Sequence, residues 1–531
     1  MIPYLAAIIL LMPLIDALNV LVYSPTFAGS HMNFMGTIAD TLTDAGHNVT
    51  FLVPVADDTK KTQFGVQSTK SVILVELADE LRKKQNVADD FLGAAWLAET
   101  TPESMDEGNR WFTEMMVNTY RNLLQNREAL QTLASIKYDV FIAEPMSQCG
   151  IAIAWHLGIT KQIIASSPVL LDFVLPLTGE PEELSYVPSF ASQSADRMSI
   201  VERYQNLRFS MAVTRQMTRL FAREHQLFGE IIGGDLPRWQ DLFAIASIIF
   251  TNSNAFLDFP RPVIQKTVPI GGIAMDLDKI RATTMSKEWD EVLNRRPKTM
   301  LVSFGTMTKS SVMPNSYRQN LLNVFASFAK VTFIWKYETD DLEWANGVDN
   351  IHFSKWVPQP ALLADHRLSA FLTHGGLGST NELAYSGKPA ITVPVLGDQM
   401  RNSLMLARHE SSIIIRHKSQ LENFAIMKEA IEQILFNETF AINAQRLAAM
   451  LQNQPLKPKE LVVKYVEFVG NYGPLTKLDP YSRQLNYFQR TMLDIYLLIG
   501  SAYFVVFSVV LYVLYKAHNF LRMRLLKSKS E

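Results

Sequence analysis

Cysteine and net charge are nearly absent from this chain. Its 531 residues include one cysteine, Cys149, and 50 Lys and Arg offset 52 Asp and Glu. A lone cysteine excludes an intramolecular disulfide framework, so we expect a buried structural thiol. A balanced charge excludes the basic field that nucleic acid requires, which leaves small molecules and lipid as the expected partners. The 10 histidines show no metal-ligand spacing, so no metal site is predicted.

Long apolar runs are confined to the two ends. Residues 4–15, YLAAIILLMPLI, are too few to span a bilayer and predict a signal peptide. Ile495–Tyr515 has 21 residues without a charge, about 31 Å as a helix, which predicts one transmembrane helix. Lys and Arg residues follow this span, so the tail is expected in the cytosol and the body in the lumen.

Short signals refine the expected location. The last five residues, KSKSE, resemble the dilysine retrieval signal of endoplasmic-reticulum membrane proteins, although membrane-flanking charge is an alternative explanation. Two acceptor sequons, Asn48-Val49-Thr50 and Asn437-Glu438-Thr439, are compatible with a glycosylated lumenal body. We therefore expect a single-pass type I protein of the endoplasmic-reticulum membrane.

Apolar strands alternate with helical stretches between the two ends, which predicts an α/β protein. A charged linker near 275–297 separates two series of strands. Apolar residues at helical spacing in Trp111–Leu133 predict a core helix rather than an acceptor pocket. The expected strands are Val20–Ser24, Val49–Val53, Val72–Glu76, Val140–Ala143, Gln162–Ala165 and Ile248–Thr251, then Thr299–Ser303, Val331–Trp335, Ile351–Phe353, Ala370–Thr373, Ile391–Val395 and Ile413–Ile415.

Polar residues gather at strand ends in the segment from Trp356 to Gln399. Trp356 and Gln359 offer an aromatic face and an amide, which a uracil ring requires. Glu382 lies one to two turns inside the next helix, where a carboxylate can bind ribose hydroxyls. Asp398 and Gln399 follow the next strand and can bind sugar hydroxyls.

The same segment offers a place for a diphosphate, which needs backbone N–H groups at a helix N-terminus without bulk in the way. Such groups follow the strand that ends at Thr373, in a turn that His374 opens, and they belong to Gly375, Gly376, Gly378, Ser379 and Thr380. A dinucleotide fingerprint fails because position 381 is Asn, and a Walker A loop fails because Pro389 follows Gly387–Lys388. Together the groups predict a nucleotide diphosphate sugar as ligand.

This segment resembles the signature of the UDP-glycosyltransferases, and the chain from about residue 19 resembles the membrane-bound animal UDP-glucuronosyltransferases. The resemblance implies a GT-B fold, in which two Rossmann-like domains face each other across a cleft and the C-terminal one binds the donor. It implies inversion at the anomeric carbon, no metal and no tightly bound cofactor. It also makes Ser303, at the end of a strand, a donor contact. UDP-glucuronate or UDP-glucose is then the donor substrate, and oligomeric state is left open.

The resemblance gives the expected division of the chain. The segments are a signal peptide (1–18), an N-terminal acceptor-binding domain (19–280), a C-terminal UDP-sugar-binding domain (281–475), a juxtamembrane segment (476–494), a transmembrane helix (495–515) and a cytosolic basic tail (516–531).

Glycosyl transfer to a hydroxyl requires a base, and an imidazole suits neutral pH. His31, in a loop after the first strand, occupies the place of the family's catalytic histidine. A carboxylate would orient and stabilise it. The family has Asp after the strand at Val140, where this chain has Glu144, one methylene longer. Asp139 is the competing candidate, although its place before the strand favours a turn or cap role.

Two further residues bear on the donor. Arg261, in Phe259-Pro260-Arg261-Pro262, resembles the family arginine near the donor, and a guanidinium suits a sugar carboxylate, so UDP-glucuronate is favoured. UDP-glucose is the alternative. Gly378 stands where many relatives have Asn or His, which leaves the phosphates to backbone groups and Ser379.

The predicted activity is therefore inverting transfer of a sugar from a UDP-sugar to a hydroxyl of a small lipophilic acceptor, with a role in detoxification. A rival of another class is a membrane-anchored binding protein with a vestigial transferase site, suggested by Glu144 and Gly378. A second rival is an enzyme that acts on membrane lipid or glycan.

Overall fold

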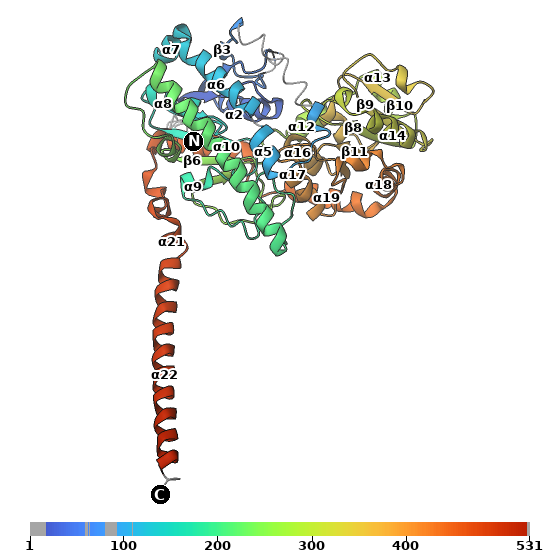
Figure 1. The fold of residues 1–531 in the computed structure, drawn as a ribbon. Helices are drawn as coiled ribbons and strands as arrows, with labels where there is room; N and C mark the ends of the chain where they lie inside the picture. The colour runs from blue at the N-terminus through green and yellow to red at the C-terminus, as the bar shows by residue number, and fades with distance from the viewer. Residues whose placement is uncertain (1–16, 59–61, 63, 80–92, 109, 528–531) are drawn as a thin grey trace, which may run out of the picture. The chain divides into compact units, whose positions relative to one another are not determined.

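The computed structural model describes residues 17–58, 62, 64–79, 93–108 and 110–527, in two compact units that divide after Leu478 (Figure 1). The predicted signal peptide falls mostly on residues 1–16, and the retrieval signal mostly on 528–531. These stretches lie outside the described residues.

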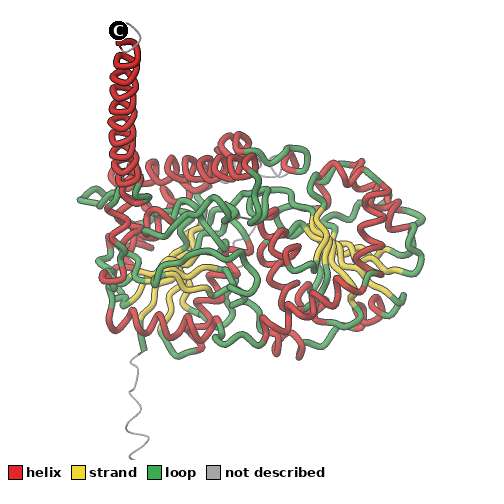
Figure 2. The backbone as a smooth tube through the Cα atoms, turned by 90° about the horizontal axis from the view of Figure 1, so that it is seen from below, coloured by secondary structure: helices red, strands yellow, loops and turns green. Residues whose placement is uncertain are grey.

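The first unit contains two parallel sheets, each surrounded by helices (Figure 2). The first sheet has the order β3-β2-β1-β4-β5-β6-β7. All six strands expected here are confirmed, and β7 was missed because it is short and ends in a proline, which cannot donate to a ladder. The strands are β1 (Asn19–Tyr23), β2 (Asn48–Pro54), β3 (Ser71–Val75), β4 (Val140–Ala143), β5 (Gln162–Ser166), β6 (Ile248–Thr251) and β7 (Thr267–Pro269).

Helices lie in most of the connections between these strands, because parallel neighbours need long crossovers, whereas β6 and β7 are joined by a loop. The helix expected at Trp111–Leu133 is two helices, because Asn126 accepts a hydrogen bond from Ala129 N at 3.0 Å and caps the start of the second. Most of its apolar stripe is buried in the core, as predicted, and so is Cys149. The helices are α2 (Gly29–Asp44), α5 (Pro102–Gly108), α6 (Arg110–Gln125), α7 (Arg127–Ala134), α8 (Cys149–His156), α9 (Leu175–Thr178), α10 (Ile200–Ile231) and α11 (Trp239–Ala244).

The second sheet has the order β10-β9-β8-β11-β12-β13, and all six expected strands are confirmed. They are β8 (Lys298–Ser303), β9 (Val331–Lys336), β10 (Ile351–Ser354), β11 (Leu368–Thr373), β12 (Ala390–Thr392) and β13 (Ser412–Ile414). The helices of this part are α12 (Leu277–Ala282), α13 (Lys287–Leu293), α14 (Asn315–Ala326), α15 (Gln359–Ala364), α16 (Leu377–Ser386), α17 (Gln399–Arg408), α18 (Phe424–Phe436) and α19 (Glu438–Gln452).

The chain crosses between the sheets twice. The helix α20 (Pro458–Tyr472) follows the second sheet, yet its Val462 and Val466 belong to the apolar cluster that contains Val20 and Ile38 of the first. We call the first sheet with its helices and α20 the N-lobe, and the second sheet with its helices the C-lobe. The predicted domain limits at residues 280 and 475 stay predictions.

A short segment from the N-terminal half of the chain, which contains Ala95 and Trp96, also packs into the C-lobe. Trp96 is fully buried in the C-lobe core, with its ring centroid 5.1 Å from that of Phe304. Lys418 donates from Nζ to the carbonyl of Ala95 at 2.6 Å and to that of Val395 at 3.0 Å. Phe304 directly follows β8, so this docking supports the loop at the carboxyl end of that strand.

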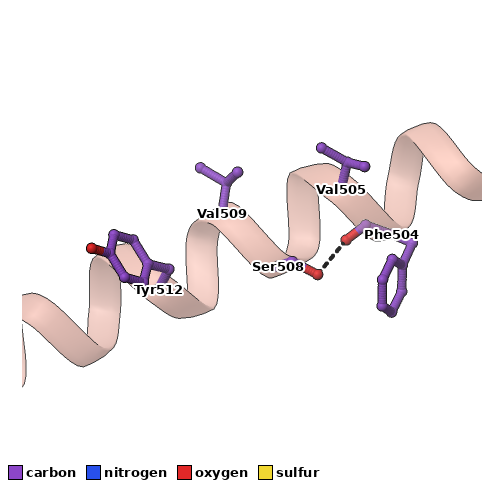
Figure 3. Close-up of a pocket in the computed structure, with 5 residues that line it drawn as sticks. All are labelled: Phe504, Val505, Ser508, Val509 and Tyr512. Atoms are coloured by element: carbon purple, nitrogen blue, oxygen red, sulfur yellow. Dashed lines mark hydrogen bonds between the residues drawn. The ribbon is translucent and has the colours of Figure 1, made fainter.

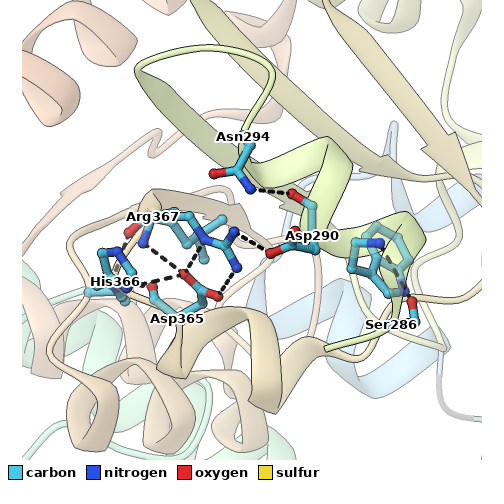
Figure 4. Close-up of polar contacts among 9 residues, drawn as sticks. Ser286, Asp290, Asn294, Asp365, His366 and Arg367 are labelled. Atoms are coloured by element: carbon cyan, nitrogen blue, oxygen red, sulfur yellow. Dashed lines mark hydrogen bonds and ion pairs between the residues drawn. The ribbon is translucent and has the colours of Figure 1, made fainter. Parts of the chain in front are cut away.

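The opposite end of the C-lobe sheet is tied by a charged network (Figure 4). Arg367, just before β11, donates to Asp365 Oδ2 at 2.7 Å and to Asp290 Oδ1 of α13 at 2.6 Å. These bonds connect the segment between the lobes to the start of the central strand.

The second unit is dominated by one helix, α22 (Leu493–Lys527), which contains the predicted span. Within Leu493–Leu526 an 18-residue window reaches a mean hydropathy of 2.4, so the helix is long and apolar enough to cross a bilayer. Its two serine hydroxyls bond within the helix: Ser501 Oγ donates to the carbonyl of Leu497 at 2.7 Å, and Ser508 Oγ to that of Phe504 at 2.8 Å (Figure 3). Lipid offers no hydrogen-bond partners, so this arrangement suits a membrane span.

Candidate functional site

The N-lobe brings His31 and Glu144 together. His31, expected in a loop, lies in the first turn of α2, because the helix begins two residues earlier at Gly29, and Glu144 directly follows β4. Strands β1 and β4 are neighbours with Tyr23 opposite Ala143, so the segments after both strands meet at one edge. His31 Nδ1 is 2.5 Å from Glu144 Oε1, and Glu144 is buried. The extra methylene of Glu144 therefore does not prevent the pair from forming.

Asp139, the competing carboxylate, has a different partner. It accepts a hydrogen bond from Asn19 N at 2.9 Å at the other end of β1. This is the turn role that its place before β4 suggested.

Sequence reasoning missed a third member of the N-lobe group. Ser167 follows β5, the neighbour of β4, and its Oγ lies 2.5 Å from His31 Nδ1. The same hydroxyl donates to Glu144 Oε1. Small hydroxyl residues are common after strands, so only the order of strands in the sheet could have marked this one.

The C-lobe places His374 at the end of β11, between two glycines. A Cβ on Gly305 would lie 2.6 Å from His374 Cε1, and one on Gly376 would lie 2.5 Å from Nε2, so neither position tolerates a side chain without movement. Burial, together with the positive charge of Lys336, lowers the pKa of His374 to about 4. His374 is therefore neutral at pH 7 and can donate a hydrogen bond but supplies no charge.

Lys336 is the second residue that sequence reasoning missed. It ends β9 and is largely buried. Its Nζ donates to the carbonyl of Gly305 at 2.7 Å and lies 3.3 Å from Glu338 Oε1. Ser303, at the end of the adjacent β8, is also buried and accepts from Gly305 N at 3.4 Å. A cation thus lies under the loop that follows Ser303, the predicted donor contact.

The predicted base and ribose groups surround α16. Gln359 Nε2 donates to Ser379 Oγ at 3.0 Å and to Glu382 Oε2 at 2.5 Å. Burial raises the pKa of Glu382 to about 7, although the bond from Gln359 lowers it. Trp356 is 67% exposed, so its ring face is open for stacking. A Cβ at Gly378 would meet nothing within 4 Å, so this position has room for a side chain.

Asp398 and Gln399 begin α17. Burial raises the pKa of Asp398, against a hydrogen bond from Asn402 and the charge of His31, which lower it. Gln399 Oε1 accepts from Val395 N at 2.8 Å, so only its NH2 end can face a ligand.

The two groups of residues face each other where the lobes meet. His31 of the N-lobe lies close enough to Asp398 of the C-lobe to act on its charge. A Cβ on Gly29, at the start of α2, would lie 3.6 Å from Thr306 Oγ1 of the C-lobe. The His31–Glu144 pair of the N-lobe thus borders the predicted sugar and phosphate positions of the C-lobe.

Among the described residues, no hydrogen bond or ion pair joins Arg261 to the other predicted donor contacts. Its guanidinium is buried in an ion pair with Glu180, which also accepts from Thr267 Oγ1. The neighbouring cavity measures about 20 Å³, room for a water molecule but not for a sugar. Among the described residues, no group of three or more His, Cys, Asp or Glu is placed to hold a metal ion.

Comparisons with known proteins agree with this geometry. A family model described as "UDP-glucoronosyl and UDP-glucosyl transferase" matches residues 19–530. The protein ugt-47 of the nematode Caenorhabditis briggsae is 28% identical over 489 residues, which cover 91% of this chain and 89% of that one. UDP-glucuronosyltransferase 1A7 of Mus musculus is 25% identical, over 91% of this chain and 88% of that one.

Solved structures show the fold. A UDP-glucosyltransferase from Polygonum tinctorium superposes with a TM-score of 0.58 at 15% identity, covering 86% of this chain and all of that one. Phytolacca americana UGT2 gives a TM-score of 0.55 at 18% identity, again over 86% of this chain and all of the other. Two parallel α/β lobes and these neighbours confirm the GT-B fold.

Proposed function

The chain belongs to the UDP-glucuronosyl and UDP-glucosyl transferase family, and from this premise we propose that it transfers a sugar with inversion from a UDP-sugar to a hydroxyl of a small lipophilic acceptor. The observation that carries the proposal is the His31–Glu144 pair, at 2.5 Å, on the lobe opposite the donor residues. Glu144 holds Nδ1, which leaves Nε2 to accept the proton of the acceptor.

The reaction is a single displacement. The acceptor oxygen forms a bond to C1 of the sugar as the bond from C1 to the UDP oxygen breaks, and the acceptor proton moves to His31 Nε2. The N-terminus of α16 and the ammonium of Lys336 stabilise the charge that develops on UDP. His374, at the start of the turn that leads into α16, contributes a hydrogen bond to the diphosphate.

The remaining donor contacts follow from the predicted roles. Trp356 stacks on uracil, Gln359 and Glu382 bind the base and ribose, and Asp398 with Gln399 binds sugar hydroxyls. Ser303, Gly376, Gly378 and Ser379 line the diphosphate.

Glucuronate is the donor sugar predicted from Arg261, and glucose is the second candidate. The buried partner Glu180 favours the second, because it neutralises the guanidinium that would bind a sugar carboxylate. An active site that accepts a neutral sugar needs no such cation.

The deciding experiment incubates the purified full-length protein with UDP-glucuronate or UDP-glucose and a panel of phenols and sterols. UDP release and the mass shift of the acceptor are measured, with His31→Ala as the inactive control. A shift by one hexose identifies glucose, and a shift by one hexuronate identifies glucuronate. Tight UDP binding without release from any acceptor would instead support a binding protein with a vestigial site.

The location is part of the proposal. We expect a cleaved signal peptide, one C-terminal span and a basic tail to put the catalytic body in the lumen of the endoplasmic reticulum, with a role in the conjugation of lipophilic compounds. Protease protection in sealed microsomes tests the orientation, and endoglycosidase sensitivity tests modification at Asn48 and Asn437.

A further inference from the structure

The ends of two neighbouring N-lobe strands are hydrogen-bonded to each other beside the His31–Glu144 pair. Strands β5 and β6 pair with Ser166 opposite Thr251, so Ser167 and Asn252, the next residues, are adjacent. Asn252 Nδ2 donates to the carbonyl of Ser167 at 2.9 Å, and Asn252 N donates to that of Ser166 at 3.0 Å. Asn252 therefore fixes the main chain that carries Ser167.

Ser167 transmits this constraint to the base. Its Oγ lies 2.5 Å from His31 Nδ1 and donates to Glu144 Oε1. Both Ser167 and Glu144 are buried, so these bonds are protected from water. The hydroxyl sets the position of the carboxylate and the ring at the same time.

The C-lobe reaches the same asparagine. Asn381 lies on α16, next to Glu382, and its Nδ2 donates to Asn252 Oδ1 at 3.3 Å. Asn381 is buried, although an asparagine inside a helix has no local reason to be. Both amides are oriented in the same direction, since each donates from its NH2 group to the next residue. If the Asn252 amide were turned over, its oxygen would face the carbonyl oxygen of Ser167, and two acceptors would meet.

We propose that Asn381, Asn252 and Ser167 are positioning residues that form a hydrogen-bonded relay from the donor helix to the catalytic base. The proposal rests on the proposed function, because His31 must meet an anomeric carbon that the other lobe holds. A base and a donor carried on separate lobes react only when the lobes are in register. The relay fixes the relative position of the two lobes close to the base, because Ser167, its last member, contacts His31 directly.

The kinetic test uses Asn381→Ala, Ser167→Ala and the double variant in the full-length protein. Each single change is expected to lower kcat on the order of tenfold through misplacement of the base. The donor KM and UDP affinity change less than about twofold, since Trp356, Gln359 and Glu382 keep their contacts. The double variant loses no more than Ser167→Ala alone, because both residues act through the same imidazole.

A matched control is Asn443→Ala, which removes another bridging amide, one that donates to the carbonyl of Glu410 at 3.3 Å far from this group in sequence. Its kcat should equal that of the parent. Ser167→Thr, which retains the hydroxyl, should recover most of the rate that Ser167→Ala loses.

A second measurement does not depend on turnover. Diethyl pyrocarbonate modifies the imidazole of His31, and mass spectrometry follows the rate relative to the exposed His366. Modification should be several-fold faster in Asn381→Ala and Ser167→Ala than in the parent. Unchanged kcat and modification in Asn381→Ala, or additive losses in the double variant, would overturn the relay. Faster modification in a protein without turnover would support the relay and contradict the proposed function.

Discussion

The carboxyl ends of the two sheets handle their polar groups in opposite ways. In the N-lobe, His31, Glu144 and Ser167 contact one another, with both Nδ1 distances at 2.5 Å. In the C-lobe, burial moves the pKa of His374 to about 4 and that of Glu382 to about 7, so both tend toward their neutral forms. One lobe holds an assembled pair, and the other holds desolvated groups whose full set of partners requires a ligand.

The proposed function accounts for the difference through what each lobe binds. A base needs its partner before the acceptor arrives, so the pairing belongs to the protein. A diphosphate brings its own negative charge, and fixed negative side chains beside it would weaken binding. Neutral groups, backbone N–H donors and the buried ammonium of Lys336, whose ion-pair partner Glu338 is the more exposed of the two, suit that ligand.

Removal of the base should distinguish the roles of the two lobes most clearly. We expect His31→Ala to lower the rate of transfer by about 10²–10⁴, the usual contribution of general base catalysis. UDP affinity, measured by calorimetry, should stay unchanged because the C-lobe is intact. Glu382→Ala should show the reverse pattern, with affinity lost first. Equal loss of affinity in both variants would mean that the lobes do not divide the work.

Removing the buried cation tests the C-lobe alone. Lys336→Met should weaken UDP binding roughly tenfold or more, because a hydrogen bond to a charged group contributes about 1.5–3 kcal/mol. Lys330→Met, an exposed lysine just before the same strand, is the matched control and should bind normally. Calorimetry at two salt concentrations measures both. Normal binding by Lys336→Met would assign the ammonium a structural role.

The strands could be predicted from sequence, and the donor residues remain predictions from one continuous segment, whereas contacts between residues far apart in the sequence could not be predicted. Buried parallel strands appear as short apolar runs, and Trp356 to Gln399 is one continuous segment, so local patterns were sufficient. Ser167 and Lys336 became visible only through strand order, because each acts on a residue of a neighbouring strand. The partner of Arg261, Glu180, lies 81 residues away, and no local pattern indicates a pair that distant.

A buried carboxyl away from both sites extends the comparison to pH. Glu224 of α10 accepts from Ser147 Oγ at 2.7 Å and Gln148 N at 2.9 Å, and burial raises its pKa to about 8. The unfolded chain releases this proton near pH 4.5, so stability is fully present below that pH and falls as pH rises toward 8. The slope is about 1.4 kcal/mol per pH unit at most.

Glu224→Gln should flatten this decline when denaturant unfolding is followed between pH 5 and 8.5. The control is Glu230→Gln, at an exposed position of the same helix, which should retain the slope of the parent. An unchanged slope in Glu224→Gln would show that the carboxyl is ionised in the folded protein at lower pH.

The smallest effect is expected at the opposite end of β11, where charge has only a structural task. Arg367 binds Asp365 and Asp290, but the Asp290 side chain is 56% exposed, so solvent screens that half of the network. We expect Asp290→Asn to cost about 0.2–1 kcal/mol of stability in denaturant unfolding and to leave kcat and UDP affinity unchanged. Asp365→Asn should cost more, because that carboxylate is less exposed and accepts from Arg367 through both oxygens. A change in kcat in Asp290→Asn would mean that the amino end of β11 is coupled to His374 at its carboxyl end, and that the sheet transmits strain along a strand.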